Sequence, residues 1–346
     1  MTNKPLQPPP VTNPLKTTGN QPATTATLTP NDKTTLFPLI DDLQLARGGN
    51  TAIVWWLTDA AKISDSVVAP LYDQLSSIGK QGCLDLVLFT RGGDTEVPWR
   101  IVSLIREFCN KFSVLVPSRA ASSGTLLALG ADEIVMTPLG VLGPIDPSRT
   151  HPLLPRREGA EEAEPISVQD MRHAMNFILN TAKPNNEMVY TPDAMAQIVT
   201  SLFDKIHPLA IGAIEQSYAL SKLIGTRCLG THLDPVKDKT KIEDIVNRLC
   251  DDYKSHAYPI CRKEAREIGL NVIDADAQVD AALMKLVKFY LGRPSGGPPA
   301  KITAGQNFKI YIGWLDSKNI QIRCEAEFHA EQTDKAKLIG DKWVNY

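Results

Sequence analysis

Short apolar runs alternate with amphipathic stretches along the first half of the chain. Four runs have the length of buried strands and lie at Thr51–Leu57, Leu84–Phe89, Ser113–Val116 and Glu133–Met136. Stretches with helical spacing separate them, at Ser66–Ile78, Pro98–Phe108 and Ser122–Leu129. This alternation of strand and helix predicts βαβ crossovers, and therefore an α/β fold built on a mostly parallel sheet.

The second half of the chain is predicted to be a helical extension, with strands only near its end. Helical stretches lie at Ala194–Phe203, Leu209–Leu223, Ile242–Tyr253, Cys261–Ile268 and Ala281–Leu291. Two alternating segments, Phe308–Trp314 and Ile320–Glu327, are predicted to be the strands of a small C-terminal β segment.

Shifts in composition divide the chain into four parts. Residues 1–34 are rich in Pro, Thr and Asn and hold few large apolar groups, so we expect a disordered tail. Residues 35–292 carry the α/β pattern and form the predicted main domain. The Pro- and Gly-rich residues 293–300 are predicted to be a linker, and residues 301–346 a β-rich extension.

The overall composition is that of an ordinary globular protein. Charged residues make up 22% and the formal net charge is −2, which gives no electrostatic reason to expect a nucleic-acid partner. The six cysteines show no Cys-x-x-Cys spacing and the histidines form no cluster, so we expect reduced thiols, no metal and no other cofactor. The start lacks a signal peptide and no run has the length of a membrane anchor, so we expect a soluble, cytoplasmic protein.

Two glycine-containing turns carry the candidate chemistry. The first is Thr90–Asp94 (TRGGD) and the second is Ser118–Thr125 (SRAASSGT), and each follows a predicted strand and precedes a predicted helix. Neighbouring strands of a parallel sheet end at the same edge, where ligands bind. We therefore expect both turns to face one site.

The placement of the turns suits a serine nucleophile at position 122. Ser122 stands at a predicted helix start, near free backbone N–H groups and the positive end of the helix dipole. The N–H groups of Gly93 and Ser123 are candidate donors for the oxyanion of a tetrahedral intermediate, and glycine lets a substrate carbonyl approach closely. Each turn taken alone is better explained by structure, as a tightly packed helix start or an ordinary glycine turn. The two turns together, at this spacing, favour a catalytic site. The Gly-x-Ser-x-Gly elbow is absent, because its first position is Ala120.

The two turns and the segments after them resemble a known family. The matching residues are Arg91-Gly92-Gly93-Asp94-Thr95, Ala120-Ala121-Ser122-Ser123-Gly124-Thr125, Leu129–Ile134, Gly143–Pro147, His256–Ile260, Glu264-Ala265 and Gly269-Leu270. Within the Clp/crotonase superfamily, they are most similar to the serine dehydrogenase proteinase family, relatives of signal peptide peptidase A and of the Clp protease subunit. The resemblance covers roughly residues 50–275.

This resemblance implies both a fold and a function. The implied fold is Clp/crotonase-like, with repeated ββα-type units, and the implied activity is that of a serine peptidase acting on a peptide or protein. Ser122 is implied as the nucleophile, with the amides of Gly93 and Ser123 as the oxyanion hole. Clp-fold proteins commonly assemble into rings or stacks, so we also expect a homo-oligomer.

The sequence does not identify the base that activates Ser122. The resemblance to signal peptide peptidase A implies a lysine, whose pKa a dry cleft lowers toward neutrality. This favours Lys205, which precedes the helix that ends at Ile224-Gly225, and places Lys183 second.

Histidines provide the other candidate bases. The resemblance to Clp proteases implies a histidine about 25 residues after the serine, but Leu142–Asp146 holds none, and His151 lies nearby in a predicted loop. His256 is a further candidate, although a histidine in such a segment is more often structural. Asp146 is expected either to orient a neighbouring side chain or to cap a turn.

Three functions fit these features. The first is a peptidase, the second a crotonase-like enzyme acting on an acyl-CoA thioester, and the third a catalytically inactive scaffold that binds peptides. A serine in Ala-x-Ser-x-Gly favours the peptidase, because crotonases usually carry more glycines and a catalytic carboxylate at the second turn.

Overall fold

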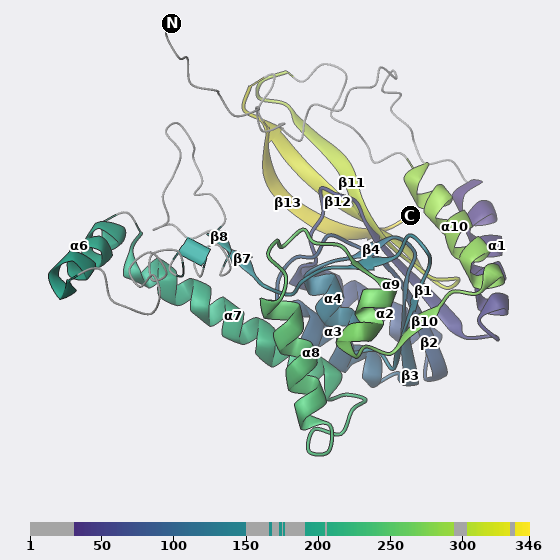
Figure 1. Ribbon diagram of the computed structural model, residues 1–346. Coiled ribbons are helices and arrows are strands. Elements are labelled where there is room, and N and C mark those ends of the chain that lie inside the picture. Colours follow the sequence, from purple (N-terminus) through teal and green to yellow (C-terminus); the bar gives the residue numbers. More distant parts are fainter. Residues whose placement is uncertain are drawn as a thin grey trace, which may run out of the picture.

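The computed structural model describes residues 31–149, 166–167, 173–174, 176, 191–204, 206–293, 303–332 and 336–346. Its centre is a sheet of eight strands (Figure 1). Across the sheet these are β10 (Val272–Asp274), β5 (Glu133–Met136), β3 (Cys109–Val116), β2 (Gln81–Phe89), β1 (Thr51–Leu57), β11 (Asn307–Asp316), β12 (Gln321–Ala330) and β13 (Ala336–Asn345). The first five are parallel and the last three antiparallel, which confirms the predicted α/β class.

The two faces of the sheet bury different apolar clusters. In β1, Ala52, Val54 and Trp56 point to one face and the residues between them to the other, as the period of two in a strand requires. The first face is covered by α1 (Asn31–Ala46) and α10 (Ala277–Leu291) (Figure 1). The cluster on the second face includes α2 (Val68–Ile78), α3 (Val97–Arg106), α4 (Ser123–Ala128), α7 (Pro208–Leu229), α8 (Lys239–Asp251) and α9 (Arg262–Ile268).

Several short elements complete the described fold. A 3₁₀ helix, η1 (Asp65–Val67), precedes α2, and α6 (Pro192–Phe203) precedes α7. A second sheet has the strand order β4 (Arg119–Ala120), β6 (Val141–Leu142) and β9 (Ile260–Cys261). A third pairs β7 (Ser148–Arg149) with β8 (Ile166–Ser167).

The ends of the chain differ from the sequence-based picture in two respects. Helix α1 begins at Asn31, inside the predicted tail, because Leu36, Ile40 and Leu43 bury one face of it against the sheet. The C-terminal residues form three strands instead of two, and β11 pairs antiparallel with β1. The extension therefore continues the central sheet.

A buried ion pair connects the C-terminal strands to the segment at the end of α10. Nη1 of Arg293 lies 3.2 Å from Oδ2 of Asp316, with their side chains 3% and 0% exposed. The hydroxyls of Tyr290 and Tyr346 donate to the same oxygen at 2.7 and 2.9 Å. Burial raises the pKa of Asp316 to about 6, against the opposing effects of Arg293 and the hydroxyl donors.

Breaking this pair is expected to destabilise the fold. The Arg293→Ala variant leaves the Asp316 carboxylate buried without its cation, so we expect the free energy of unfolding to fall by about 3–5 kcal/mol. Denaturant unfolding measures the change. Lys318→Ala is the control, because Lys318 pairs with Asp41 in solvent and such pairs contribute about 0–1 kcal/mol. Equal losses in the two variants would contradict the argument.

Candidate active site

Hydrogen bonds and bridges join the two glycine turns at the carboxyl ends of β2 and β3. Thr90, after β2, forms a parallel bridge with Ala120, after β3. The hydroxyl of Ser123 donates to the carbonyl oxygen of Gly93 at 2.6 Å. The two segments, predicted to share a sheet edge, are therefore in direct contact.

Ser122 has a strained backbone conformation. Its φ of 53° and ψ of −117° make it the one non-glycine residue with positive φ among those the structure describes. Such a conformation costs about 1–3 kcal/mol and is often found at functional sites. The residue stands immediately before α4, at the N-cap position, and its side chain makes no capping hydrogen bond.

The strain at Ser122 predicts that glycine is more stable than alanine at this position. Glycine adopts positive φ without the steric cost of a Cβ atom. We therefore expect Ser122→Gly to unfold with a free energy about 1 kcal/mol higher than Ser122→Ala, after allowing for the greater entropy of unfolded glycine. Denaturant midpoints of the two variants test this, and a glycine variant less stable than the alanine variant would contradict it.

Backbone amides lie beside Ser122 on both turns. Ile63 bonds to both neighbours of Gly93: its N–H donates to the Gly92 carbonyl oxygen and its carbonyl oxygen accepts from the Asp94 N–H, each at 2.8 Å. In a parallel bridge this arrangement turns the N–H and C=O of Gly93 away from Ile63. Among the described residues, neither the Gly93 nor the Ser123 N–H donates a hydrogen bond. Gly93 lines the cleft described below, whereas Ser123 is buried.

The structure gives a different reason for glycine at positions 92 and 93. A Cβ atom on Gly93 would lie 2.2 Å from the carbonyl oxygen of Ile63, and one on Gly92 would lie 2.7 Å from Cβ of Ser122. Both glycines are therefore needed for contacts within the protein. The sequence-based expectation assigned the close approach at Gly93 to a substrate carbonyl.

The second sheet gathers three segments that are distant in sequence. Its strand β4 ends two residues before Ser122, β6 ends four residues before Asp146, and β9 begins four residues after His256. Leu142 pairs with Ala120 on one side and with Ile260 on the other. Three short strands thus bring a hydroxyl, a carboxylate and an imidazole to one side of the molecule.

Asp146 and His256 form a partly buried pair. Nδ1 of His256 lies 3.0 Å from Oδ1 of Asp146, and the two side chains are 35% and 1% exposed. The hydrogen bond to Asp146 raises the pKa of His256 above its usual value of 6.5, against the opposing effect of burial. A carboxylate at Nδ1 holds the proton there and leaves Nε2 free to accept another.

A cleft of about 610 Å³ contains Ser122, Gly93 and His256 among its lining residues. We call it the Ser122 cleft. Its mouth is polar and carries an exposed ion pair between Arg91 and Asp59. The structure thus brings together the predicted nucleophile, one predicted oxyanion donor and one candidate base.

The other candidate bases lie outside the described residues. These are Lys205, Lys183 and His151. The pairing of His256 with Asp146 was not foreseen, and 110 positions separate the two residues. The only sequence signal for this pairing was that both residues lie in segments that resemble the serine dehydrogenase proteinase family.

The described residues can also be compared with the expectations on cysteines, metal ions and membrane-spanning segments. All six cysteines are free there. Within the same ranges, no group of three His, Cys, Asp or Glu side chains is arranged to hold a metal ion. None of the described helices combines the length and apolar character needed to cross a membrane.

Comparison with known proteins identifies relatives of this chain. Residues 64–190 match the family described as "ClpP-like SDH-type serine proteinase". Two uncharacterized proteins of Methanocaldococcus jannaschii, MJ0137 and MJ1495, are 25% and 24% identical over 207 and 220 residues. These matches cover 60% and 63% of this chain, and 58% and 60% of the length of the relatives.

Solved structures are also similar to this chain. Two are mutants of the 1510-N membrane-bound stomatin-specific protease, one of them in complex with a substrate peptide. Both are 18% identical to this chain and cover 72% of it, with 88% and 84% of their own lengths matched and TM-scores of 0.34 and 0.33. The resemblance to the serine dehydrogenase proteinase family that the two glycine turns predict is thus confirmed by the family match over residues 64–190.

Proposed function

We propose that the chain is a peptidase that hydrolyses peptide bonds through Ser122, with His256 as the base and Asp146 orienting it. The observation that carries the proposal is the composition of the Ser122 cleft. A strained serine and a histidine bonded to a buried carboxylate line the same cleft. The family match supports a serine peptidase at the coarser level.

Each group has a defined part in the proposed reaction. Oγ of Ser122 attacks the carbonyl carbon of the substrate, and its proton passes to Nε2 of His256. The N–H groups of Gly93 and Ser123 stabilise the oxyanion of the tetrahedral intermediate. When the intermediate collapses, His256 protonates the departing amine, and water then hydrolyses the acyl-enzyme by the same sequence in reverse.

Asp146 supports this role for His256 through its charge. Its Oδ1 holds the imidazole, while its Oδ2 is buried and has no hydrogen-bond partner among the described residues. A buried carboxylate with one unbonded oxygen contributes little to stability, and it favours the positive imidazolium that forms during attack. The pair is therefore better explained by catalysis than by folding.

Lys205 remains the alternative base that the family resemblance favours. A Ser122–Lys205 dyad predicts the same products, so the two proposals differ only in which variant loses activity.

Peptide hydrolysis is tested with a mixture of synthetic peptides analysed by mass spectrometry. We expect the wild-type chain and Ser118→Ala to produce the same new termini, because Ser118 does not line the cleft. Ser122→Ala should produce none. An unchanged peptide mixture with tight acyl-CoA binding would instead support a crotonase-like enzyme, and peptide binding without cleavage would support a scaffold.

The pH dependence of the reaction follows from the raised pKa of His256. A base must be neutral to accept a proton, so kcat/KM is expected to fall as the pH drops through a value above 6.5. The stability contributed by the charged pair has the opposite dependence: it is fully present below pH 6.5 and is lost as the pH rises through the pKa of the folded state. A pH–rate profile with its acid limb at or below 6.5 would contradict the assignment.

A further inference from the structure

A second cavity lies at the opposite end of α4 from Ser122. It has a volume of about 480 Å³ and shares no lining residue with the Ser122 cleft. We call it the His232 cavity. Its lining combines polar groups with apolar side chains from Leu129, Ile134, Leu229, Leu233, Ile245 and Leu270. Its size is in the range of sites for small organic molecules.

His232 supplies an uncommitted polar group to this cavity. Neither nitrogen of its ring has a hydrogen-bond partner among the described residues, and Nδ1 is buried. Nε2 is therefore the nitrogen that remains accessible. Burial lowers the pKa of His232 below 6.5, against the opposing effect of Asp132 and with further lowering by Arg106 and Lys241. Nε2 can therefore bond to a molecule in the cavity without displacing a protein partner.

Lys241 supplies a positive charge beside His232. It lines the cavity from the first turn of α8 and forms no ion pair with any described residue. Its Cε lies close to Gly269, 4.0 Å from the position that a Cβ atom would take there.

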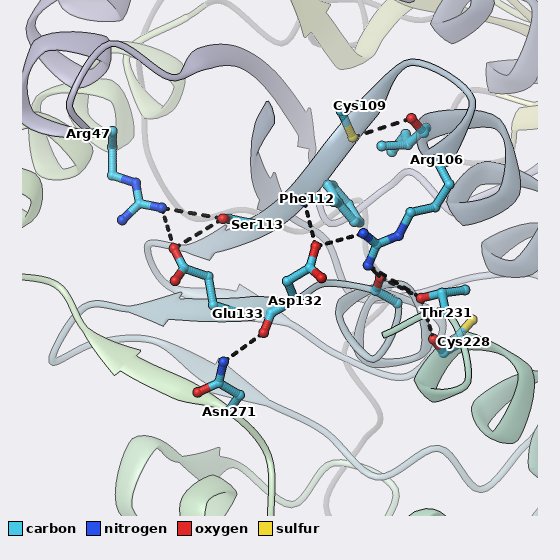
Figure 2. A network of polar contacts seen from close by, with 12 residues as sticks. Arg47, Arg106, Cys109, Phe112, Ser113, Asp132, Glu133, Cys228, Thr231 and Asn271 are labelled. Carbon is cyan, nitrogen blue, oxygen red and sulfur yellow. Dashed lines mark hydrogen bonds and ion pairs between the residues drawn. The ribbon is translucent and has the colours of Figure 1, made fainter. Parts of the chain in front are cut away.

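The acidic residue of the cavity is already neutralised. Asp132 accepts a hydrogen bond from Nη1 of Arg106 at 2.7 Å and another from the Phe112 N–H at 2.7 Å (Figure 2). Its backbone carbonyl accepts from Nδ2 of Asn271, also at 2.7 Å (Figure 2). Because the charge of Asp132 is balanced by Arg106, the unpaired charge of the lining is that of Lys241.

We propose that the His232 cavity binds a small carboxylate with an apolar chain. The carboxylate accepts hydrogen bonds from the Lys241 ammonium and from Nε2–H of His232, and the chain packs against the leucine and isoleucine side chains. A free fatty acid and the C-terminal residue of a cleaved peptide share this chemistry. The site is separate from the chemistry at Ser122, and its occupancy does not depend on the proposed peptidase activity.

Calorimetric titration of the Ser122→Ala chain tests this proposal without any turnover. The probes are octanoate, its neutral analogue octanol, and N-acetyl-leucine. We expect octanoate to bind at least about tenfold more tightly than octanol, since a hydrogen bond to a charged group is the stronger kind. Tighter binding of N-acetyl-leucine than of octanoate would assign the site to peptide ends, and the reverse order to fatty acids.

Two lysine variants of α8 test the role of Lys241, one as the test and one as its control. Lys241→Gln should reduce the octanoate affinity to that of octanol. Lys239→Gln should leave it unchanged, because Lys239 lies outside the lining and contacts Glu243 in solvent. Octanoate should also shift the imidazole NMR signals of His232, assigned with a His232→Gln variant. Equal binding of octanoate and octanol, no binding of either at millimolar concentration, or an unshifted His232 signal would overturn the proposal.

Discussion

The His256→Ala variant is expected to lose peptidase activity by about 10⁴-fold or more. Without the imidazole, the proton of Ser122 loses the acceptor proposed for it, and losses of this size are typical when one member of a serine–histidine pair is removed. Steady-state kcat/KM on a cleaved peptide measures the loss. Added imidazole should restore part of the activity, because it can enter the space vacated by a partly exposed side chain.

Two control variants separate the proposed base from its alternatives. His329→Ala removes a partly exposed histidine whose partner is Asn307, and it should leave kcat/KM unchanged. Lys205→Ala should change kcat/KM by less than about threefold if His256 is the base, since a residue outside the machinery contributes little to transition-state stabilisation. Loss of activity in Lys205→Ala, with His256→Ala still active, would establish the serine–lysine dyad instead.

The Asp146→Asn variant is expected to lower kcat/KM by about 10³–10⁴-fold without destabilising the fold. The amide has nearly the same shape, but it neither holds the imidazole in the same tautomer nor stabilises the imidazolium. Removing a buried charge that has one unbonded oxygen should leave the free energy of unfolding unchanged or higher.

The pH profile of Asp146→Asn distinguishes an effect on the pKa of His256 from an effect on folding. Asp146 is the main cause of the raised pKa of His256, so the acid limb should shift toward lower pH in this variant. A variant that is unstable as well as inactive, with an unshifted acid limb, would show that Asp146 acts through folding.

Much of the fold was predictable because its strands are locally encoded. β1 and β5 have the predicted bounds, since after one polar residue each is an apolar run that is buried in the sheet. β13 was not predicted, because charged residues and Gly340 interrupt its pattern and most of the strand is exposed. It is stabilised by pairing with β12 along its length.

The candidate site was predictable only in part, because some of its contacts depend on strand pairing between distant segments. Ser122 and Gly93 lie in turns whose position at a sheet edge follows from the neighbouring strands. The pairing of His256 with Asp146 depends on the register of two-residue strands in the second sheet, where Leu142 lies opposite Ile260. No spacing within the sequence encodes that contact.

The proposed peptidase activity depends on a Ser122 hydroxyl that is activated as a nucleophile within the Ser122 cleft. Its most direct test is incubation of the folded chain with a fluorophosphonate, followed by intact-mass measurement and peptide mapping. We expect a single adduct on Ser122 in the wild-type chain and none in Ser122→Ala. An unmodified wild-type chain, or an adduct on a different residue that persists in Ser122→Ala, would contradict it.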